Sequence, residues 1–333
     1  MTAQPTSRAA SGPLLQMVDL HVTYRTTAGD LPAVRGVSLT VDRGEILGVA
    51  GESGCGKSTL AATVLRLSPA NAKVTGQVLL EGEDVLTMKW GALRAVRWAQ
   101  ASIVFQGALH SLNPVRSIEQ QIAEPIILHE DVSAREAAQR VGGLLEQVGL
   151  PARRGKAYPH QISGGQKQRV MIAMALACRP RLIIADEPTT ALDVMVQAQV
   201  LDLLSSLVRD LGVGLMMISH DLSVLGSTCD RVAVMYAGKI IEEGPAATVF
   251  ANAGHPYSAA LSAAFPTIGD PQSRRAPAGL PGDPPDPAAL PTGCSFHQRC
   301  PLAFDRCPSQ EPPLVQIAPG HQAACLLLAG AQP

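Results

Sequence analysis

The chain has 333 residues, which is enough for one large domain with an appendage or for two domains. Its 27 Lys and Arg residues balance 28 Asp and Glu residues, so no basic surplus points to nucleic acid or anionic lipid. No apolar run approaches the roughly 18 residues of a membrane helix, and residues 1–13 lack the apolar core of a signal peptide. We therefore expect a soluble, intracellular protein whose seven cysteines are reduced thiols or metal ligands.

Composition divides the chain near residue 265. Before that point apolar strands alternate with helices, and the near-continuous apolar runs predict a sheet covered on both faces. Residues 117–162 are helical in pattern, with Ser133 and Glu136 placed as a capping box. We expect an α/β domain over 1–265, with a helical subdomain at about 107–165, and a Pro-rich linker and Cys-rich extension over 266–333. The expected strands are 37–41, 46–50, 102–106, 181–186, 213–219, 231–236 and 239–243.

A glycine-rich segment between an apolar strand and a helix has the pattern of a phosphate loop. Its glycines let consecutive backbone N–H groups face phosphate, Lys57 can reach the β and γ phosphates, and Ser58 can ligate Mg²⁺. The following helix, 57–67, points its N-terminal dipole at the anion. The expected phosphate-binding residues are Gly51, Glu52, Ser53, Gly54, Cys55, Gly56, Lys57, Ser58 and Thr59.

Polar residues follow several of the buried strands, at the sheet edge where ligands collect in open α/β sheets. We expect Asp186 to hold the Mg²⁺ shell and Glu187 to orient the attacking water, because phosphoryl transfer is mostly positioning and charge stabilisation. His220 can contact the γ phosphate, and Gln106 can reach the Mg²⁺ or the water. Taken alone, a histidine here is more often an ordinary polar residue, and the glutamine would indicate nothing.

A second anion site is predicted at the start of a helix that runs to about residue 178. Ser163 can cap this helix, and Gly164 and Gly165 expose backbone N–H groups ahead of Gln166. Two phosphate-binding helix ends beside a single phosphate loop predict dimerisation, in which each subunit closes on the nucleotide of the other. Tyr24, upstream of the loop, is either a core aromatic or a platform for adenine.

Together these motifs resemble the ATPases of ABC transporters, and more narrowly the oligopeptide/dipeptide importer branch, over residues 14–326. The resemblance implies a P-loop ABC ATPase core with a RecA-like mixed sheet. It implies that Tyr24 stacks on adenine and that Gln106 senses Mg²⁺ and the membrane subunit. It also aligns 163–166 with the family signature, Asp186 with the Walker B acid, Glu187 with the catalytic glutamate, Asp193 with the D-loop and His220 with the switch histidine.

The branch assignment depends on less general strings, such as Ser-Leu-Asn-Pro at 111–114 and His-Pro-Tyr at 255–257. The resemblance implies uptake of peptides, or of nickel or glutathione in related importers. It implies a second ATPase subunit, two transmembrane permease subunits and an extracytoplasmic substrate-binding protein, with this chain peripheral on the cytoplasmic face of the membrane. An ABC ATPase acting on nucleic acid is the competing class, but it predicts a basic stripe or tandem cassettes, which the sequence lacks.

The tail carries Cys294, Cys300, Cys307 and Cys325, separated by five, six and seventeen residues. Four thiolates can form a Zn²⁺ site or hold an iron–sulfur cluster. The close Cys-x-x-Cys pairs typical of zinc are absent, and the importer branch, which this chain resembles, has tails that hold a 4Fe-4S cluster. We therefore expect a 4Fe-4S cluster, with Zn²⁺ or free thiols as alternatives. We expect it to organise the tail and to leave nucleotide binding by the ATPase core largely unchanged.

Overall fold

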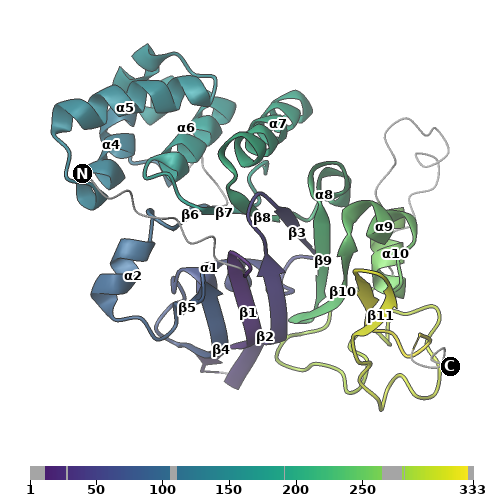
Figure 1. Cartoon of the computed structure of the whole chain (residues 1–333). Helices are drawn as coiled ribbons and strands as arrows, with labels where there is room; N and C mark the ends of the chain where they lie inside the picture. The colour runs from purple at the N-terminus through teal and green to yellow at the C-terminus, as the bar shows by residue number, and fades with distance from the viewer. Residues whose placement is uncertain are drawn as a thin grey trace, which may run out of the picture.

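The computed structural model describes residues 12–27, 29–105, 111–190, 192–264, 280 and 282–328. They form two sheets, a set of helices above the larger sheet, and an extension at one end of it (Figure 1). No helix among these residues has the length and apolar character needed to cross a lipid bilayer.

The larger sheet has eight strands in the order β11-β12-β10-β9-β3-β8-β7-β6. The five strands from β9 to the edge strand β6 are parallel, and such strands read as continuous apolar runs. Alternate residues of β3 enter two different cores: Ile46 packs among the helices, and Leu47 packs beneath the smaller sheet. The prediction of a sheet covered on both faces is thus confirmed. The parallel strands are β3 (Ile46–Ala50), β6 (Ala101–Val104), β7 (Leu182–Asp186), β8 (Gly214–Ile218) and β9 (Arg231–Tyr236).

The smaller sheet is antiparallel, in the order β2-β1-β4-β5. Of its strands the sequence predicts only the end of β2, because β1 and β4 mix buried and exposed residues and carry no continuous apolar run. A register shift interrupts β1 near Asp19, whose φ is 45°. The strands are β1 (Leu15–Thr26), β2 (Gly29–Val41), β4 (Ala72–Leu80) and β5 (Glu83–Asp84).

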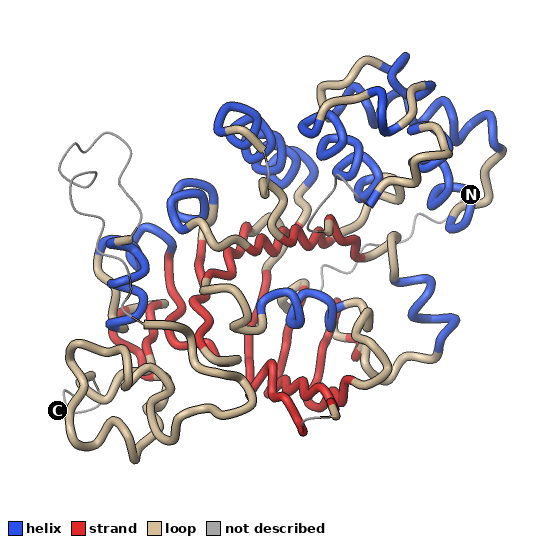
Figure 2. Tube along the Cα trace, turned by 180° about the vertical axis from the view of Figure 1, so that it is seen from behind, coloured by secondary structure: helices blue, strands red, loops and turns tan. Residues whose placement is uncertain are grey.

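A helical subdomain lies between β6 and β7 in the sequence and forms a separate lobe above the sheet (Figures 1 and 2). It contains α4 (Ile118–His129), α5 (Ala134–Gln147) and α6 (Gly164–Leu176), with short 3-10 turns at Ala152–Lys156 and Pro159–Gln161. The predicted capping box of α5 is present, since the Ser133 side chain accepts from the Glu136 N–H and Glu136 accepts from the Ser133 N–H. Ser117 caps α4 in the same way.

Of the remaining helices, α7 and α8 connect strands of the larger sheet, α1 and α2 lie in the connections between the two sheets, and α9 and α10 follow β10. Helix α1 is shorter than the predicted 57–67, because Arg66 adopts a left-handed φ of 50°. These helices are α1 (Lys57–Val64), α2 (Trp90–Val96), α7 (Val194–Leu211), α8 (Leu222–Thr228), α9 (Ala246–Ala251) and α10 (Pro256–Ala263).

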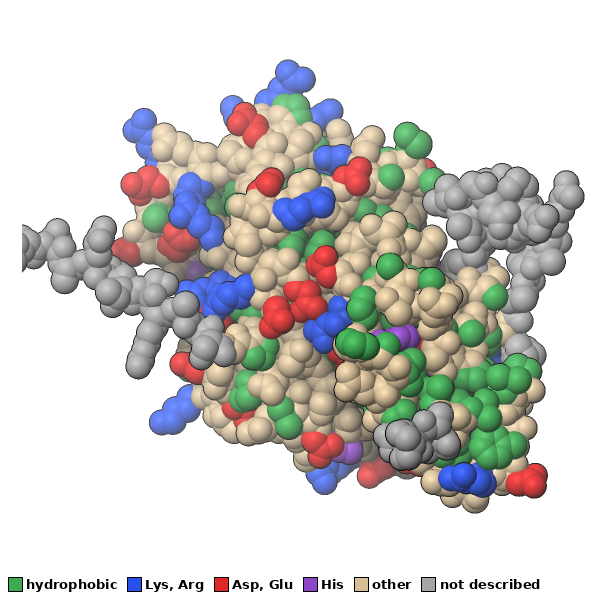
Figure 3. All heavy atoms as spheres, turned by 45° about the vertical axis from the view of Figure 1, so that its right-hand side comes forward, with side chains coloured by type: hydrophobic (Ala, Val, Ile, Leu, Met, Phe, Trp, Pro, Cys, Tyr) green, Lys and Arg blue, Asp and Glu red, His purple; other side chains and the backbone are tan. Residues whose placement is uncertain are grey.

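The C-terminal extension adds a hairpin to the larger sheet. Strands β11 (Val315–Ala318) and β12 (His321–Ala323) pair with each other, and β12 pairs with β10 (Lys239–Pro245) through Glu242 and Glu243. Hydrophobic side chains gather over this extension in the space-filling view (Figure 3), and Leu302 is 56% exposed. The boundary at 265 stays a prediction, since 265–279 lie outside the described residues.

Candidate functional site: a phosphate loop beside strand-end acids

The phosphate loop joins β3 to α1, and two of its glycines are required by sterics. Gly51 and Gly56 have φ values of 145° and 108°. A Cβ at Gly51 would lie 2.4 Å from the Met235 carbonyl oxygen, and one at Gly56 would lie 2.2 Å from that of Ala33. No side chain caps α1, so its first N–H groups remain available to an anion. The loop therefore fits a bound phosphate.

Lys57 and Ser58 begin α1 and point in different directions. The Lys57 ammonium, nearly buried, donates to the carbonyl oxygens of Gly51 (2.7 Å) and Glu52 (2.8 Å) and so lies across the loop. The Ser58 hydroxyl donates to Asp186 Oδ1 at 3.2 Å. The structure thus brings together the two oxygen groups that the sequence assigns to Mg²⁺, which prefers oxygen ligands.

Asp186 ends β7 and is only 7% exposed. Burial raises the pKa of its carboxyl, while the Ser58 hydrogen bond and the charge of Lys57 act in the opposite direction. A divalent cation at this position would favour the ionised form. The donor set of Ser58 and Asp186 therefore fits a Mg²⁺ ion.

Glu187 and His220 lie at the ends of the neighbouring strands β7 and β8. Glu187 Oε1 is 3.2 Å from His220 Nδ1, and Oε2 accepts from the Thr190 hydroxyl at 2.8 Å. Glu187 has a φ of 47°, a strained value for a residue other than glycine. These contacts hold the Glu187 carboxylate at the sheet edge next to Asp186, where a water that attacks the γ phosphate would have to be polarised.

The predicted signature segment folds as the sequence indicates. The Ser163 hydroxyl accepts from the Gln166 N–H (3.3 Å), and the Gln166 side chain accepts from the Ser163 N–H (3.1 Å). Gly164 starts α6, and a Cβ at Gly165 would lie 2.4 Å from Val196 in α7. The segment is thus a tightly packed helix start with two glycines.

Three further predicted residues have different outcomes. The hydroxyl of Tyr24, in β1, lies 3.0 Å from the Thr59 hydroxyl in α1, so this aromatic is close to the phosphate loop. Asp193 caps α7 by accepting from the Val196 N–H at 3.0 Å. Gln106 and the 107–110 segment that follows it lie outside the described residues.

Two residues that touch the loop were not predicted. The Tyr257 hydroxyl in α10 accepts from the Glu52 N–H at 2.9 Å, and Arg299 of the extension donates to both carboxylate oxygens of Glu52. In the sequence, only Glu52 could have indicated such a contact, because an acidic residue in a loop that binds phosphate needs a positively charged partner to neutralise it.

Cys294, Cys300, Cys307 and Cys325 line one small cavity together with Leu302 and Leu326. Burial raises the thiol pKa of the first, second and fourth of them, and each of these three sulfurs also accepts a backbone N–H from two residues further on. Among the described residues, no group of three or more His, Cys, Asp or Glu side chains is placed so that it could hold a metal ion.

Comparison with known proteins agrees with this geometry. The ABC transporter family model matches residues 34–190, and the model for the oligopeptide/dipeptide transporter C-terminal region matches 241–307. Two solved cassettes share the fold. The dimeric bacterial ABC transporter cassette MJ0796 aligns with a TM-score of 0.63 and 28% identity over 70% of this chain and 98% of its own. CbiO1 from Clostridium perfringens aligns with a TM-score of 0.62 and 29% identity over 72% and 91%. The protein is thus an ABC transporter ATPase, which hydrolyses ATP to drive transport.

The chain is 43% identical to the oligopeptide transport ATP-binding protein OppD of Escherichia coli (strain K12), over 96% of this chain and 95% of that protein. It is also 43% identical to OppD of Salmonella typhimurium, over 94% and 93%. The chain therefore belongs to the ATP-binding subunits of oligopeptide/dipeptide ABC importers.

Proposed function

We propose that this chain is one of two ATPases that drive a pair of membrane permease subunits supplied with peptides by an extracytoplasmic binding protein. The adjacent pairs Ser58–Asp186 and Glu187–His220 at one sheet edge support the ATPase part of this proposal most directly. In this proposal the loop binds ATP, Ser58 and Asp186 hold Mg²⁺, and Glu187 aligns the water under the control of His220. Gln106 would complete the Mg²⁺ shell, and Tyr24 would stack on adenine.

The second nucleotide-binding half would come from a partner ATPase. Ser163, Gly164, Gly165 and Gln166 would close on the nucleotide of the partner, with Asp193 at the same interface. Val194 and Met195, which follow Asp193, are 80% and 71% exposed, as expected of apolar residues that a partner covers. Val115, 80% exposed, follows the segment with Gln106, and we assign it to the permease contact on the cytoplasmic side.

Co-purification of the complex from membranes, followed by mass spectrometry, tests the assembly. We expect two permeases and two ATPases, the second encoded by a different gene. Uptake into proteoliposomes is then compared for short peptides, nickel and glutathione with ATP inside the vesicles. Uptake of nickel or glutathione without peptide uptake would reject the peptide assignment, and recovery of this chain with nucleic acid and without permeases would reject the importer.

We further propose that the four tail cysteines hold a 4Fe-4S cluster. Their shared cavity and the N–H groups aimed at three of the sulfurs support it, since such hydrogen bonds tune clusters.

Anaerobic purification tests the cluster. We expect brown protein with absorption near ~400 nm and about four irons per chain, as a Cys₄ cluster requires. Each single replacement of Cys294, Cys300, Cys307 or Cys325 by Ser should lose or degrade the cluster, whereas Cys178→Ser should retain it. Stoichiometric zinc after purification from iron-replete cells would contradict the proposal, and so would metal-free protein with an ordered tail.

A further inference from the structure

The C-terminal extension reaches the phosphate loop through a buried ion pair. Arg299, which is only 9% exposed, donates from Nη1 to Glu52 Oε2 (2.7 Å) and from Nη2 to Oε1 (3.0 Å). This is the two-pronged geometry in which a guanidinium binds a carboxylate most strongly. The hydrogen bond with Glu52 is the main cause that raises the pKa of Arg299, so the guanidinium remains charged.

Aromatic side chains hold this guanidinium in place. Its central carbon lies 6.0 Å from the ring centres of both Tyr236 and Phe296. Tyr257 packs against both of these rings, and its hydroxyl accepts from the Glu52 N–H at 2.9 Å. The backbone and the carboxylate of Glu52 are therefore each fixed from outside the loop.

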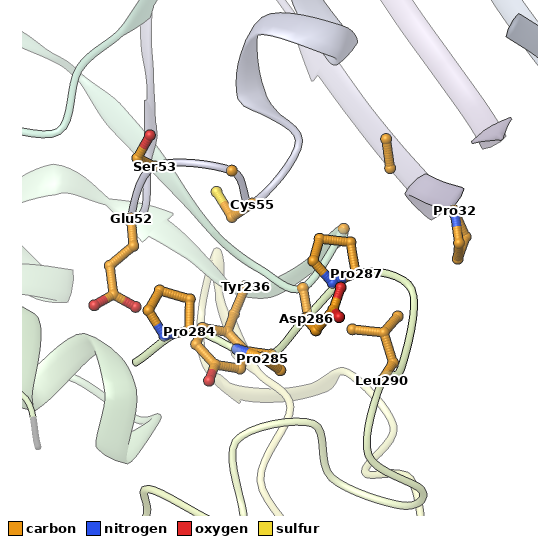
Figure 4. A pocket seen from close by; sticks show the side chains of 14 residues that line it. Pro32, Glu52, Ser53, Cys55, Tyr236, Pro284, Pro285, Asp286, Pro287 and Leu290 are labelled. Carbon is orange, nitrogen blue, oxygen red and sulfur yellow. The ribbon is translucent and has the colours of Figure 1, made fainter. Parts of the chain in front are cut away.

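A second segment of the extension faces the loop across a pocket. Residues 284–290 pass beneath it and line a pocket together with loop residues 52–55 (Figure 4). In this view Pro284 and Pro285 lie next to Tyr236, and Asp286 and Pro287 lie below Cys55. The loop is thus bounded on one side by α1 and the sheet, and on the other by the extension.

Because Glu52 is negatively charged, its contact with Arg299 affects the affinity of the loop for ATP. A carboxylate within a loop that binds a triphosphate repels the phosphates, and the repulsion is strong where water is partly excluded. Arg299 neutralises this charge and keeps the carboxylate turned toward the extension. It does so from the extension, through the side chain of Glu52.

We infer that Arg299 is a positioning residue for the phosphate loop, through which the folded extension sets the affinity for ATP. The inference goes beyond the transport function and does not depend on a metal in the tail. It requires only the contact between Arg299 and Glu52, 247 residues apart in the chain.

A double-mutant cycle on the purified full chain tests this role. The dissociation constant of ATP with Mg²⁺ is measured by displacement of a fluorescent ATP analogue. We expect Arg299→Ala to weaken binding roughly tenfold, or about 1.4 kcal/mol. With Glu52→Gln already present, the repelling charge is gone, so the same replacement should weaken binding by less than about twofold. Arg306→Ala is the matched control, because Arg306 lies in the extension but bonds to Gln310 at its surface.

Two outcomes would overturn the inference. Unchanged ATP affinity in Arg299→Ala would show that the ion pair does not act on the loop. An equal loss in the presence and absence of Glu52→Gln would show that Arg299 only supports the fold of the extension. Melting curves of all variants, measured without nucleotide, separate this second case from the positioning role.

Discussion

Nδ1 of His220 lies 3.2 Å from Oε1 of Glu187, so the imidazole that follows β8 is paired with the carboxylate that follows β7. Each side chain follows a parallel strand, and the two strands are neighbours in the sheet. The carboxylate is thereby held at the sheet edge beside Asp186, the position from which it can align a water for attack on the γ phosphate.

Because Glu187 is assigned to the attacking water, its replacement should affect ATP hydrolysis but not ATP binding. We expect Glu187→Gln to reduce ATP turnover by the assembled complex at least ~100-fold, the lower range for loss of a general base, while ATP still binds. Phosphate release and ATP binding are measured on the same preparation. Glu146→Gln, an exposed glutamate in α5, is the control. Normal turnover in Glu187→Gln would rule out the assigned role.

The signature segment is expected to act on the nucleotide of the partner. Lys57→Ala should weaken ATP binding by the isolated subunit, whereas Ser163→Arg should spare it and abolish turnover in the complex. Because Ser163 is also a helix cap worth about 1 kcal/mol, Ser133→Arg serves as the control, since Ser133 caps α5 with the same geometry. Loss of ATP binding by isolated Ser163→Arg would contradict a role in trans.

A buried carboxylate joins the core to the extension. Glu242 is fully buried and accepts from His321 Nε2 (2.7 Å) and from the N–H groups of Gly254 (2.6 Å) and His255 (2.9 Å). We expect Glu242→Ala to lower the free energy of unfolding by at least about 2 kcal/mol, because three donors lose their acceptor. Urea denaturation and limited proteolysis of the extension measure the effect.

The chain offers a matched comparison for this prediction. Glu311 of the extension pairs with Lys239 of β10, but this ion pair is largely exposed. Glu311→Ala should therefore change the unfolding free energy by less than about 1 kcal/mol. Equal changes in the free energy of unfolding for the two replacements would show that the burial of Glu242 contributes nothing to stability.

Stability of the helical subdomain should depend on pH through Glu130. Arg140 hydrogen-bonds Glu130 and also the Ala177 carbonyl oxygen (3.0 Å), and it holds the pKa of Glu130 below its usual value. The unfolded chain then binds more protons as the pH falls through the acidic range, so the stabilisation is present above about pH 4.5 and is lost below it. Glu130→Gln should be less stable than the wild type at pH 7, and the difference should close on acidification, with Glu124→Gln as an exposed control.

Loss of the proposed metal should also reach the nucleotide site. Cys300 follows Arg299 directly, so disorder of the cysteine pocket would remove the guanidinium from Glu52. We expect Cys300→Ser to lower iron content and to weaken ATP binding in the same direction as Arg299→Ala, with Cys178→Ser as the control. Loss of iron with unchanged ATP affinity would show that the metal and the loop are independent.

The sequence alone was enough to predict several features that depend on neighbouring residues. The phosphate loop, the acids at the end of β7, the capping box of α5 and the Ser163 cap of α6 each lie within a few residues, where backbone geometry and hydrogen bonding impose a pattern. The parallel strands were predicted for a related reason, since burial on both faces requires continuous apolar runs.

Only the tertiary structure decided how the extension relates to the ATPase core. From the sequence we expected the tail to leave nucleotide binding largely unchanged, whereas Arg299 bonds to Glu52 and β12 joins β10. Strands β1 and β4 were missed for the same reason as these contacts. The two strands pair with each other although their partners, such as Tyr24 and Ala72, lie far apart in the chain, and such pairing leaves no local periodicity in the sequence.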